Sequence, residues 1–399
     1  MSFLSKYHTV SQKRFPILTA ELNMSHSNPE KYQSLPSLIS DIKAGNRRAL
    51  SKAISLAESS LDEDRNLTEQ LLQAILPDTG KSKRIGITGS PGVGKSTFIE
   101  TFGLACIEKG ERVAVLAIDP SSQSHGGSIL GDKVRMPVLA RSEDAYIRPS
   151  PSRLTLGGVS NATREALLIC EAAGFTTILI ETVGVGQSEV EVRSMTDLFL
   201  LLTLPMAGDE VQGIKRGIME LADIIFINKS DGDLESFADM SKSQIQSALT
   251  LMHSPTEDWK VQAMTGSGLH GNGILELLQL CDDFFEISAP HHHAMTERRN
   301  MQNQEWFELA FHRELILWAE KQESIKQAKI EALQYIANGI TVPSMAARAI
   351  VKSHLHSDWG QHPISSQNGI FAIIFTLYYV NEHYISGRNS QAIPGAFNR

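Results

Sequence analysis

Short apolar runs alternate with helical stretches along the middle of the chain, from about residue 84 to about residue 288. Each run has the length of a buried strand and ends where a polar or glycine-rich loop begins. The six runs are Arg84–Thr88, Val113–Ile118, Thr176–Ile180, Leu198–Thr203, Ile224–Ile227 and Lys260–Met264. Because strands that alternate with helices form βαβ units, the pattern predicts an α/β fold with a mostly parallel, doubly wound sheet. In such a sheet the loops after the carboxyl ends of the strands form the ligand site.

A helical segment precedes this core. The pattern of its apolar residues ends at Pro77-Asp78-Thr79-Gly80, where the chain has strong turn formers. The residues at helical spacing are Leu38, Ile42, Ala49, Ala53 and Leu56, followed by the run Leu67–Leu76. We expect a helical arm over residues 36–80 after a loose, polar leader over residues 1–35, so that the core covers residues 81–289.

A second helical segment follows the core. Its apolar stripe consists of Phe307, Phe311, Leu315 and Trp318, continued by Ile325, Ala328, Ala332 and Ile336. The stripe predicts a helical arm over residues 290–353. The arm either docks on its own core or forms a dimer contact, which Trp306 and Trp318 favour because we expect them to be exposed. We assign no role to the tail over residues 354–399.

Composition limits the partners and the compartment. Thirty-seven basic against 45 acidic residues give a net charge of −8, so the chain lacks the positive field that holds nucleic acid or an anionic membrane. The longest apolar stretches, Leu198–Ala207 and Phe371–Val380, are too short to cross a bilayer. Three separated cysteines, Cys106, Cys170 and Cys281, fit a reducing compartment. We expect a cytoplasmic protein, or one of the mitochondrial matrix in a eukaryote, with no nucleic-acid or membrane partner.

A phosphate-binding motif lies directly after the first strand. Residues 89–96 match the pattern G-x-x-x-x-G-K-[ST], and a helix is expected over Thr97–Glu108. In this motif backbone N–H groups surround the phosphates, the lysine reaches the β- and γ-oxygens, and the Ser or Thr hydroxyl binds Mg²⁺. The candidate phosphate-binding residues are Gly89, Ser90, Pro91, Gly92, Val93, Gly94, Lys95, Ser96 and Thr97.

A base-recognition motif follows the strand Ile224–Ile227. Asn228-Lys229-Ser230-Asp231 has the form N-K-x-D, whose carboxylate accepts both the N1–H and the exocyclic amine of guanine. Adenine lacks this pair of donors. Such a tetrapeptide alone is usually a solvated turn, but here it lies at a strand's carboxyl end in a chain that also has a phosphate loop. We therefore assign Asn228, Lys229 and Asp231 to the base, and we expect GTP rather than ATP.

Acidic residues at two other strand ends are candidate magnesium ligands. Glu181-Thr182-Val183-Gly184 follows the third strand, and it places a carboxylate beside Mg²⁺ with the Gly184 N–H free to meet the γ-phosphate. Asp119 ends the second strand and Asp132 lies in a glycine-rich loop, where each is either a metal ligand or the cap of a local turn. The candidate catalytic residues are Lys95, Ser96, Glu181 and Gly184.

Two further groups of residues have alternative interpretations. Three consecutive histidines, His291–His293, cannot all point at one tetrahedral ion, so we interpret them as a solvated linker. Arg153, Arg193 and Arg216 are each candidates for a built-in arginine finger. The sequence does not choose among the three.

With these residues in place, the chain resembles the MeaB/ArgK/MMAA family of P-loop GTPases, which are chaperones of adenosylcobalamin-dependent acyl-CoA mutases. The resemblance extends from about Leu38 to about Ser353. Its most specific stretches are Gly45–Leu50, Ile85–Ser96, Asp119–Met136, Arg148–Val159, Asn161–Gly174, Glu181–Glu189, Ala207–Asp223 and Asn228–Asp231. Met206 and Leu154 depart from glycines that the family usually has.

The resemblance implies a homodimer whose contacts come from the carboxy-terminal arm, and an amino-terminal helical arm packed on the G domain. It implies that Mg²⁺ is bound or the nucleotide sensed by Ser96, Asp119, Asp132 and Glu181. It also implies that Gln262-Ala263-Met264 contacts the guanine O6 through a backbone N–H. A mobile loop over Gly208–Lys215 communicates with the mutase in this family, and within it we assign a switch role to Gln212 and Lys215.

The leading hypothesis is a GTPase that uses GTP/GDP and Mg²⁺ to gate cofactor loading of an adenosylcobalamin-dependent acyl-CoA mutase and to protect that enzyme. Two alternatives stay open. A nickel-inserting metallochaperone GTPase would need a Cys/His metal site near the nucleotide loops. A P-loop kinase of a transport protein would prefer ATP, which Asn228–Asp231 opposes.

Overall fold

A computed structural model gives the arrangement of most of the chain. It describes residues 34–59, 61–119, 135–151, 158–182, 187–205, 216–287 and 293–357. The chain forms two compact units, Met1–Phe311 and His312–Arg399. The predicted leader, the loops that hold Asp132, Gly184, Gln212 and Lys215, and most of the tail lie outside the described residues.

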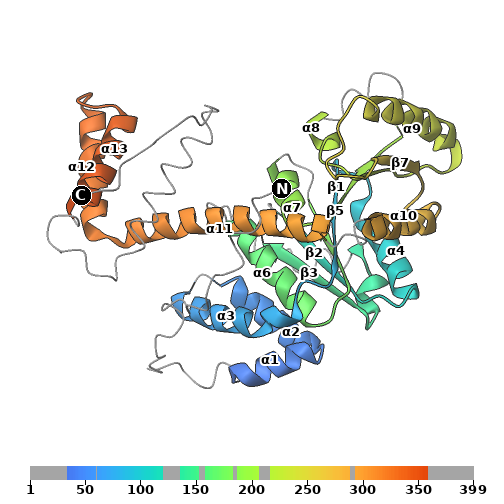
Figure 1. The fold of residues 1–399 in the computed structure, drawn as a ribbon, viewed down its shortest axis with the longest axis horizontal. Coiled ribbons are helices and arrows are strands. Elements are labelled where there is room, and N and C mark those ends of the chain that lie inside the picture. The colour runs from blue at the N-terminus through green and yellow to red at the C-terminus, as the bar shows by residue number, and fades with distance from the viewer. Residues whose placement is uncertain are drawn as a thin grey trace, which may run out of the picture. The chain divides into compact units, whose positions relative to one another are not determined.

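The first unit contains a seven-stranded sheet in the order β3-β2-β4-β1-β5-β6-β7 (Figure 1). Every paired strand in the described residues runs parallel to its neighbour. The strands are β1 (Lys83–Gly89), β2 (Val113–Asp119), β3 (Ala145–Pro151), β4 (Thr177–Glu181), β5 (Leu198–Thr203), β6 (Ile224–Ile227) and β7 (Gln262–Thr265). The central strands β4, β5 and β6 are buried along their whole length, because both faces of the sheet are covered.

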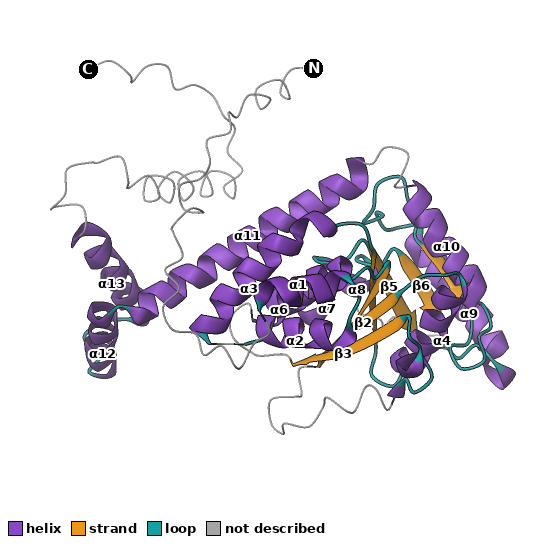
Figure 2. Cartoon of the chain, turned by 90° about the horizontal axis from the view of Figure 1, so that it is seen from below, coloured by secondary structure: helices purple, strands orange, loops and turns teal. Residues whose placement is uncertain are grey.

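Helices cover both faces of this sheet (Figures 1 and 2). In β5, Leu198, Leu200 and Leu202 belong to the core beneath α4 and α10, whereas Phe199 belongs to the core beneath α6 and α7. This alternation is the two-residue period of a strand. The helices are α4 (Lys95–Glu108), α6 (Gly158–Ala172), α7 (Gln187–Arg193), α8 (Arg216–Met219), α9 (Glu235–Leu249) and α10 (Ile274–Ile287). The predicted doubly wound α/β fold is confirmed.

Strand β3 is absent from the sequence-based prediction. It reads Ala-Tyr-Ile-Arg-Pro-Ser-Pro, and its two prolines, Pro149 and Pro151, argue against a strand. The structure places it at the edge of the sheet, paired only with β2 among the described strands. An edge strand tolerates proline because half of its backbone N–H groups need no partner in the sheet. The prediction missed β3 because edge position cannot be seen in a local pattern.

Three helices form the predicted helical segment over residues 36–80. They are α1 (Leu35–Lys43), α2 (Arg47–Ala57) and α3 (Asp62–Ile75), and their apolar faces pack with α6. The chain turns between α1 and α2 at Gly45, which has φ +74°. Asn46 then starts α2, since its side chain accepts hydrogen bonds from the backbone N–H groups of Arg48 and Ala49.

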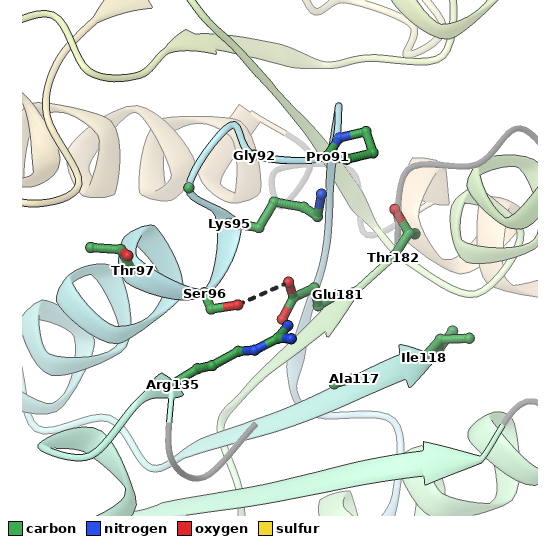
Figure 3. Close-up of a pocket in the computed structure, with 11 residues that line it drawn as sticks. Pro91, Gly92, Lys95, Ser96, Thr97, Ala117, Ile118, Arg135, Glu181 and Thr182 are labelled. Atoms are coloured by element: carbon green, nitrogen blue, oxygen red, sulfur yellow. Dashed lines mark hydrogen bonds between the residues drawn. The ribbon is translucent and has the colours of Figure 1, made fainter. Parts of the chain in front are cut away.

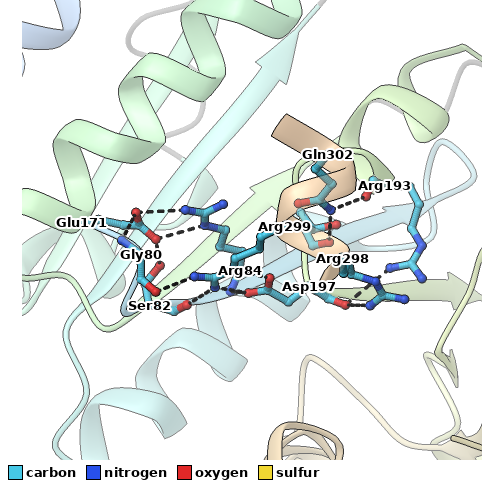
Figure 4. Close-up of polar contacts among 10 residues, drawn as sticks. Gly80, Ser82, Arg84, Glu171, Arg193, Asp197, Arg298, Arg299 and Gln302 are labelled. Carbon is cyan, nitrogen blue, oxygen red and sulfur yellow. Dashed lines mark hydrogen bonds and ion pairs between the residues drawn. The ribbon is translucent and has the colours of Figure 1, made fainter. Parts of the chain in front are cut away.

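The amino-terminal edge of the sheet holds the first part of α11 (His293–Lys321) through a network of arginines and carboxylates (Figure 4). Arg299 donates to both oxygens of the fully buried Asp197, at 2.9 and 2.6 Å. Arg298 donates to the backbone oxygen of Asp197 and, at 2.7 Å, to Thr256. The network fixes this part of α11 on its own core.

Trp306, which the sequence predicts to be exposed, is half-buried in the structure. Its ring lies 4.2 Å from the guanidinium of Arg164, and its Nε1 donates to the Ser194 backbone oxygen at 3.1 Å. It is therefore half-buried at the end of α7. Trp318 is exposed, as predicted, and Phe307 of the stripe is exposed too.

The second unit contains the end of α11 with α12 (Glu323–Ala337) and α13 (Pro343–Ser357), which extends past the predicted arm boundary at residue 353. Its exposed apolar side chains include Ile330, Leu333, Ile340, Met345 and Val351. The three cysteines of the first unit are buried free thiols, as expected. Within the described ranges, no helix is both long enough and apolar enough to span a membrane.

Candidate functional site

A pocket of ≈ 470 Å³ lies at the carboxyl ends of β1, β2 and β4 (Figure 3). Its walls come from the segment after β1, the last residues of β2, the turn before β3 and the end of β4. The lining residues are Pro91, Gly92, Gly94, Lys95, Ser96, Thr97, Ala117, Ile118, Arg135, Glu181 and Thr182. The structure thus brings together most of the predicted phosphate-binding residues and two predicted magnesium ligands, Ser96 and Glu181, at the edge of the sheet where the sequence placed them.

The glycines of the phosphate loop are required by close approaches. Gly94 has φ +95°, and a Cβ there would lie 3.0 Å from Nδ2 of Asn228. A Cβ at Gly89 would lie 2.5 Å from the backbone oxygen of Leu202. Any side chain at these two positions would push the loop away from β5 or from the base-recognition motif.

Lys95 begins α4 and turns back over the loop. Its Nζ donates to the backbone oxygens of Gly89 at 2.8 Å and Ser90 at 3.3 Å. Burial lowers the pKa of Lys95, while the carboxylates of Glu181 and Glu189 oppose that effect. A partly desolvated ammonium group of this kind gains much from anionic oxygens placed in the pocket.

Ser96 and Glu181 could hold Mg²⁺. The Ser96 hydroxyl donates to Oε1 of Glu181 at 3.4 Å, so a hydroxyl and a carboxylate converge at one point of the pocket wall (Figure 3). These hard oxygens fit Mg²⁺, which takes few protein ligands and completes its shell with water and phosphate oxygens. Of the other predicted ligands, Asp119 ends β2 with its side chain outside the described part, and Asp132 lies outside it entirely.

The base-recognition motif is tied to the phosphate loop by side chains. Asn228 donates through Nδ2 to the backbone oxygen of Val93 at 2.8 Å, and its Oδ1 accepts from the backbone N–H of Gly268 at 2.7 Å. Lys229 Nζ donates to the backbone oxygen of Gly92 at 3.0 Å. Asn228 therefore joins three segments: the phosphate loop, the end of β6 and the loop after β7.

Asp231, the residue assigned to the guanine N–H groups, lies at the start of the turn Gly232–Leu234. Its Oδ2 is 3.4 Å from Nε2 of His270, and its side chain is 32% exposed. The carboxylate is thus accessible, beside a loop that comes from a different part of the chain.

The segment predicted to contact the guanine O6 lies inside a strand. Gln262, Ala263 and Met264 lie inside β7 and pair with Ile224–Phe226 of β6, so they do not form the loop at the carboxyl end. That loop is 266–270, which is held by the Gly268 N–H on Asn228 and by Thr101, whose hydroxyl donates to the Gly268 oxygen at 2.6 Å. Strand β7 ends at Thr265, one residue beyond the predicted run Lys260–Met264.

Comparisons with known proteins agree with this geometry. Residues 50–323 match the family model described as methylmalonyl Co-A mutase-associated GTPase MeaB. A probable GTPase of Mycobacterium tuberculosis is 44% identical over 318 residues, which cover 79% of this chain and 94% of the relative. The chain belongs to the MeaB family.

Two further similarities extend over most of this MeaB-family chain. The mouse protein named methylmalonic aciduria type A homolog, mitochondrial, is 41% identical over 327 residues, covering 79% of this chain and 78% of the relative. A crystal structure of a protein called LAO/AO transport system kinase is 35% identical, with a TM-score of 0.64, and covers 83% of this chain and 100% of that one. As a MeaB-family protein, this chain is a P-loop GTPase that binds guanine nucleotides.

Sequence reasoning missed several residues at the MeaB-family site. Arg135 lines the pocket, and Gly268 and His270 contact the base-recognition motif. A cationic residue just after a glycine-rich loop was a usable signal for Arg135, whereas nothing local marks the other two. Of the arginine-finger candidates, Arg193 is bound to Asp223 at 3.1 Å at the opposite edge of the sheet. The side chains of Arg153 and Arg216 lie outside the described residues, as do those of His291–His293.

Proposed function

We propose that this MeaB-family GTPase is the G-protein chaperone of an adenosylcobalamin-dependent acyl-CoA mutase of the methylmalonyl-CoA mutase type. Its GTP cycle would gate cofactor loading and protect the mutase. The observation that carries the proposal is the match of residues 50–323 to the family described as methylmalonyl Co-A mutase-associated. The mouse relative is named methylmalonic aciduria type A homolog, mitochondrial, which supports the same link. We propose a location in the mitochondrial matrix if the source is a eukaryote and in the cytoplasm otherwise.

We propose that the residues around the pocket bind the phosphates and the base of the nucleotide. The backbone N–H groups of residues 89–97 would surround the α- and β-phosphates, and Lys95 would face the β- and γ-oxygens. Asn228, Lys229 and Asp231 would hold the base, with a backbone N–H of the loop 266–270 on the guanine O6. Each part rests on a feature already described. These are the buried Lys95 ammonium, the hydrogen bond from Asn228 to the Val93 oxygen and the accessible Asp231 carboxylate.

Magnesium would be held by Ser96 and Glu181, with Asp119 and Asp132 as further candidates. When bound, Mg²⁺ supplies positive charge to the β- and γ-phosphate oxygens. The Ser96 hydroxyl and the Glu181 carboxylate orient it, and the Gly184 N–H would sense the γ-phosphate. Because these groups position charge rather than form bonds, we expect slow intrinsic turnover that a partner accelerates.

The partner would be sensed by the loop 208–215, with Gln212 and Lys215 as its switch residues. We expect the double variant Gln212→Ala/Lys215→Ala to hydrolyse GTP at the intrinsic rate but to lose its stimulation by the mutase. Coupling between sites is typically about 1–3 kcal/mol, so roughly 5- to 150-fold of stimulation should disappear. Turnover measured with and without purified mutase tests this. Equal stimulation of both proteins would reject the switch role.

A homodimer formed through the second unit is part of the proposal. Exposed apolar side chains on α12 and α13, among them Leu333, Met345 and Val351, support a surface that a second copy covers. Sedimentation of the full chain measures the assembly, and a monomer at micromolar concentration would contradict it.

Capture of the partner tests the central claim. The full chain, immobilised with a non-hydrolysable GTP analogue or with GDP, is exposed to cell extract. We expect a cobalamin-dependent mutase to be retained in a nucleotide-dependent manner. The Lys95→Ala variant is the matched control, because it keeps the surface but should lose the nucleotide response. Absence of any cobalamin enzyme from both captures would refute the chaperone role.

A second function is suggested by the similar protein of known structure, which is called a transport system kinase. A kinase of a transport protein would transfer the γ-phosphate to a protein side chain. The Asn228–Asp231 motif argues against the ATP preference that this function would bring. Incubation with labelled GTP or ATP distinguishes the two, since a kinase produces labelled protein and a GTPase releases labelled phosphate.

A further inference from the structure

Two of the described residues that line the nucleotide pocket are cationic, Lys95 and Arg135. Lys95 is already held over the phosphate loop by Gly89. Arg135 enters from the other side, after β2, and Figure 3 shows its guanidinium end directed toward Ser96 and Glu181. The pocket therefore carries a second positive charge near the place where the terminal phosphate and its metal would lie.

The backbone that follows Arg135 is anchored to the core and to α4. Met136, the next residue, is fully buried in the core beneath α4. The turn after it is bound to α4, because Glu100 accepts hydrogen bonds from the backbone N–H groups of Val138 at 2.7 Å and Leu139 at 3.3 Å. The backbone on the carboxyl side of Arg135 is thus anchored, and the exposed Arg135 side chain lines the pocket from there.

Four other arginines with described side chains form ion pairs away from the pocket. Arg193 forms its ion pair with Asp223 at the amino-terminal edge of the sheet, opposite the nucleotide. The remaining pairs are Arg84 with Glu171, Arg148 with Glu58 and Arg299 with Asp197. Among the described arginines, Arg135 is the one whose charge faces the pocket.

We propose that Arg135 is a catalytic residue, an arginine finger that the chain supplies to its own active site. In hydrolysis the water oxygen forms a bond to the γ-phosphorus, and the bond from that phosphorus to the β–γ bridging oxygen breaks. The electron pair of the broken bond stays on the GDP oxygen, and the proton lost by water leaves with phosphate or solvent. Arg135 donates hydrogen bonds to the oxygens on which negative charge grows during this transfer.

The inference rests on the proposed placement of the phosphates against residues 89–97, and its test separates the two. Purified full-length wild type, Arg135→Ala and Arg135→Lys are compared in single-turnover GTP hydrolysis. The matched control is Arg141→Ala, since Arg141 is an exposed arginine in the same segment that does not line the pocket. Binding of fluorescent GDP, with and without aluminium fluoride, provides a readout besides activity.

We expect Arg135→Ala to lower kcat by about 1,000-fold or more, since an arginine finger contributes roughly 10³- to 10⁵-fold to kcat in phosphoryl transfer. Affinity for GDP should change by less than about threefold, whereas the extra affinity conferred by aluminium fluoride should be lost. Arg135→Lys should restore part of the rate, because it keeps the charge without the bidentate geometry. Arg141→Ala should behave as the wild type, and thermal melting of each variant confirms that it is folded.

Three results would overturn the proposal. Wild-type turnover of Arg135→Ala, beside an inactive Lys95→Ala, would remove Arg135 from catalysis while leaving the pocket assignment intact. An equal loss of GDP affinity and of turnover would make Arg135 a ground-state phosphate ligand. An equal effect of Arg141→Ala would trace the loss to disturbance of the segment. If Lys95→Ala also hydrolyses GTP normally, the proposed phosphate site itself fails.

Discussion

Asn228 shows how one side chain organises the nucleotide site. Its amide uses both ends, donating to the Val93 oxygen and accepting from the Gly268 N–H. It is 2% exposed, so each of these hydrogen bonds replaces water that the folded chain excludes. A motif interpreted as base recognition thus also joins segments separated by 135 and 40 positions in the sequence.

At the same scale, replacement of Asp231 tests base selectivity. Asp231→Asn removes the acceptor for the guanine amine and adds a donor that suits the 2-oxo group of xanthine. We expect GTP affinity to fall about 10- to 150-fold, as the loss of a hydrogen bond to a charged group costs roughly 1.5–3 kcal/mol, and XTP affinity to rise. Titration with both nucleotides measures the shift. Asp233→Asn, in the exposed turn that follows, is the control, and unchanged GTP affinity in Asp231→Asn would refute the guanine assignment.

Among the elements, α11 depends most on tertiary contacts. Its first part is held by Arg298, Arg299 and the buried Gln302, whose side chain donates to the Thr196 oxygen at 2.9 Å. These residues look like an ordinary solvated helix face in the sequence, because their acceptors lie about one hundred positions earlier. The helix is therefore part of the first unit up to Phe311.

We expect Asp197→Ala to destabilise the first unit by about 3–5 kcal/mol, since it leaves the Arg299 guanidinium without its partner in a site where that carboxylate is fully buried. Unfolding by urea, followed by circular dichroism, measures the change. The half-exposed pair of Lys43 and Asp78 provides the comparison, and Asp78→Ala should cost less than about 1 kcal/mol. Equal losses of unfolding free energy in the two variants would show that burial does not make the Asp197 pair more stabilising than the half-exposed pair.

For the molecule as a whole, the buried carboxylate of Glu171 makes stability depend on pH. Burial raises the pKa of Glu171, but the charge of Arg84 and hydrogen bonds from Arg84, Ser82 and Gly80 outweigh it, so the pKa is lowered below its ordinary value of 4.5. The bonds join α6 to β1 and to the segment before it. The contribution of Glu171 to the free energy of unfolding is therefore complete above pH 4.5, and it is lost as the pH falls through the pKa of Glu171 in the folded chain.

Glu171→Gln should therefore lower the melting temperature at pH 7 and reduce the fall in stability below about pH 4.5. Melting curves of both proteins between pH 3 and pH 7 measure the difference. Parallel curves over the whole range would mean that Glu171 does not contribute to the acid sensitivity of the fold.

The limits of sequence-based prediction can be seen in particular residues. The strands with continuous apolar runs were located correctly, and residues 89–96 and Asn228–Asp231 follow strands as predicted, because each pattern is encoded by adjacent residues. β3 was missed because its prolines are acceptable only at a sheet edge, and Trp306 was placed in solvent because Arg164 and Ser194 are remote in sequence. The assignment of the O6 contact to Gln262–Met264 stays a prediction, and the structure shows these residues paired with β6.

By itself, then, the sequence determined the chemistry of the nucleotide loops and the α/β class of the core, since backbone conformation and periodic burial depend on neighbouring side chains. The tertiary structure decided the order of the strands, the loop that reaches Asn228, and the pocket that Arg135 faces. It also decided which carboxylate each buried arginine meets. Those contacts join residues up to 219 positions apart, as between Gly80 and Arg299, and they exist only once the packed layers have brought the segments together.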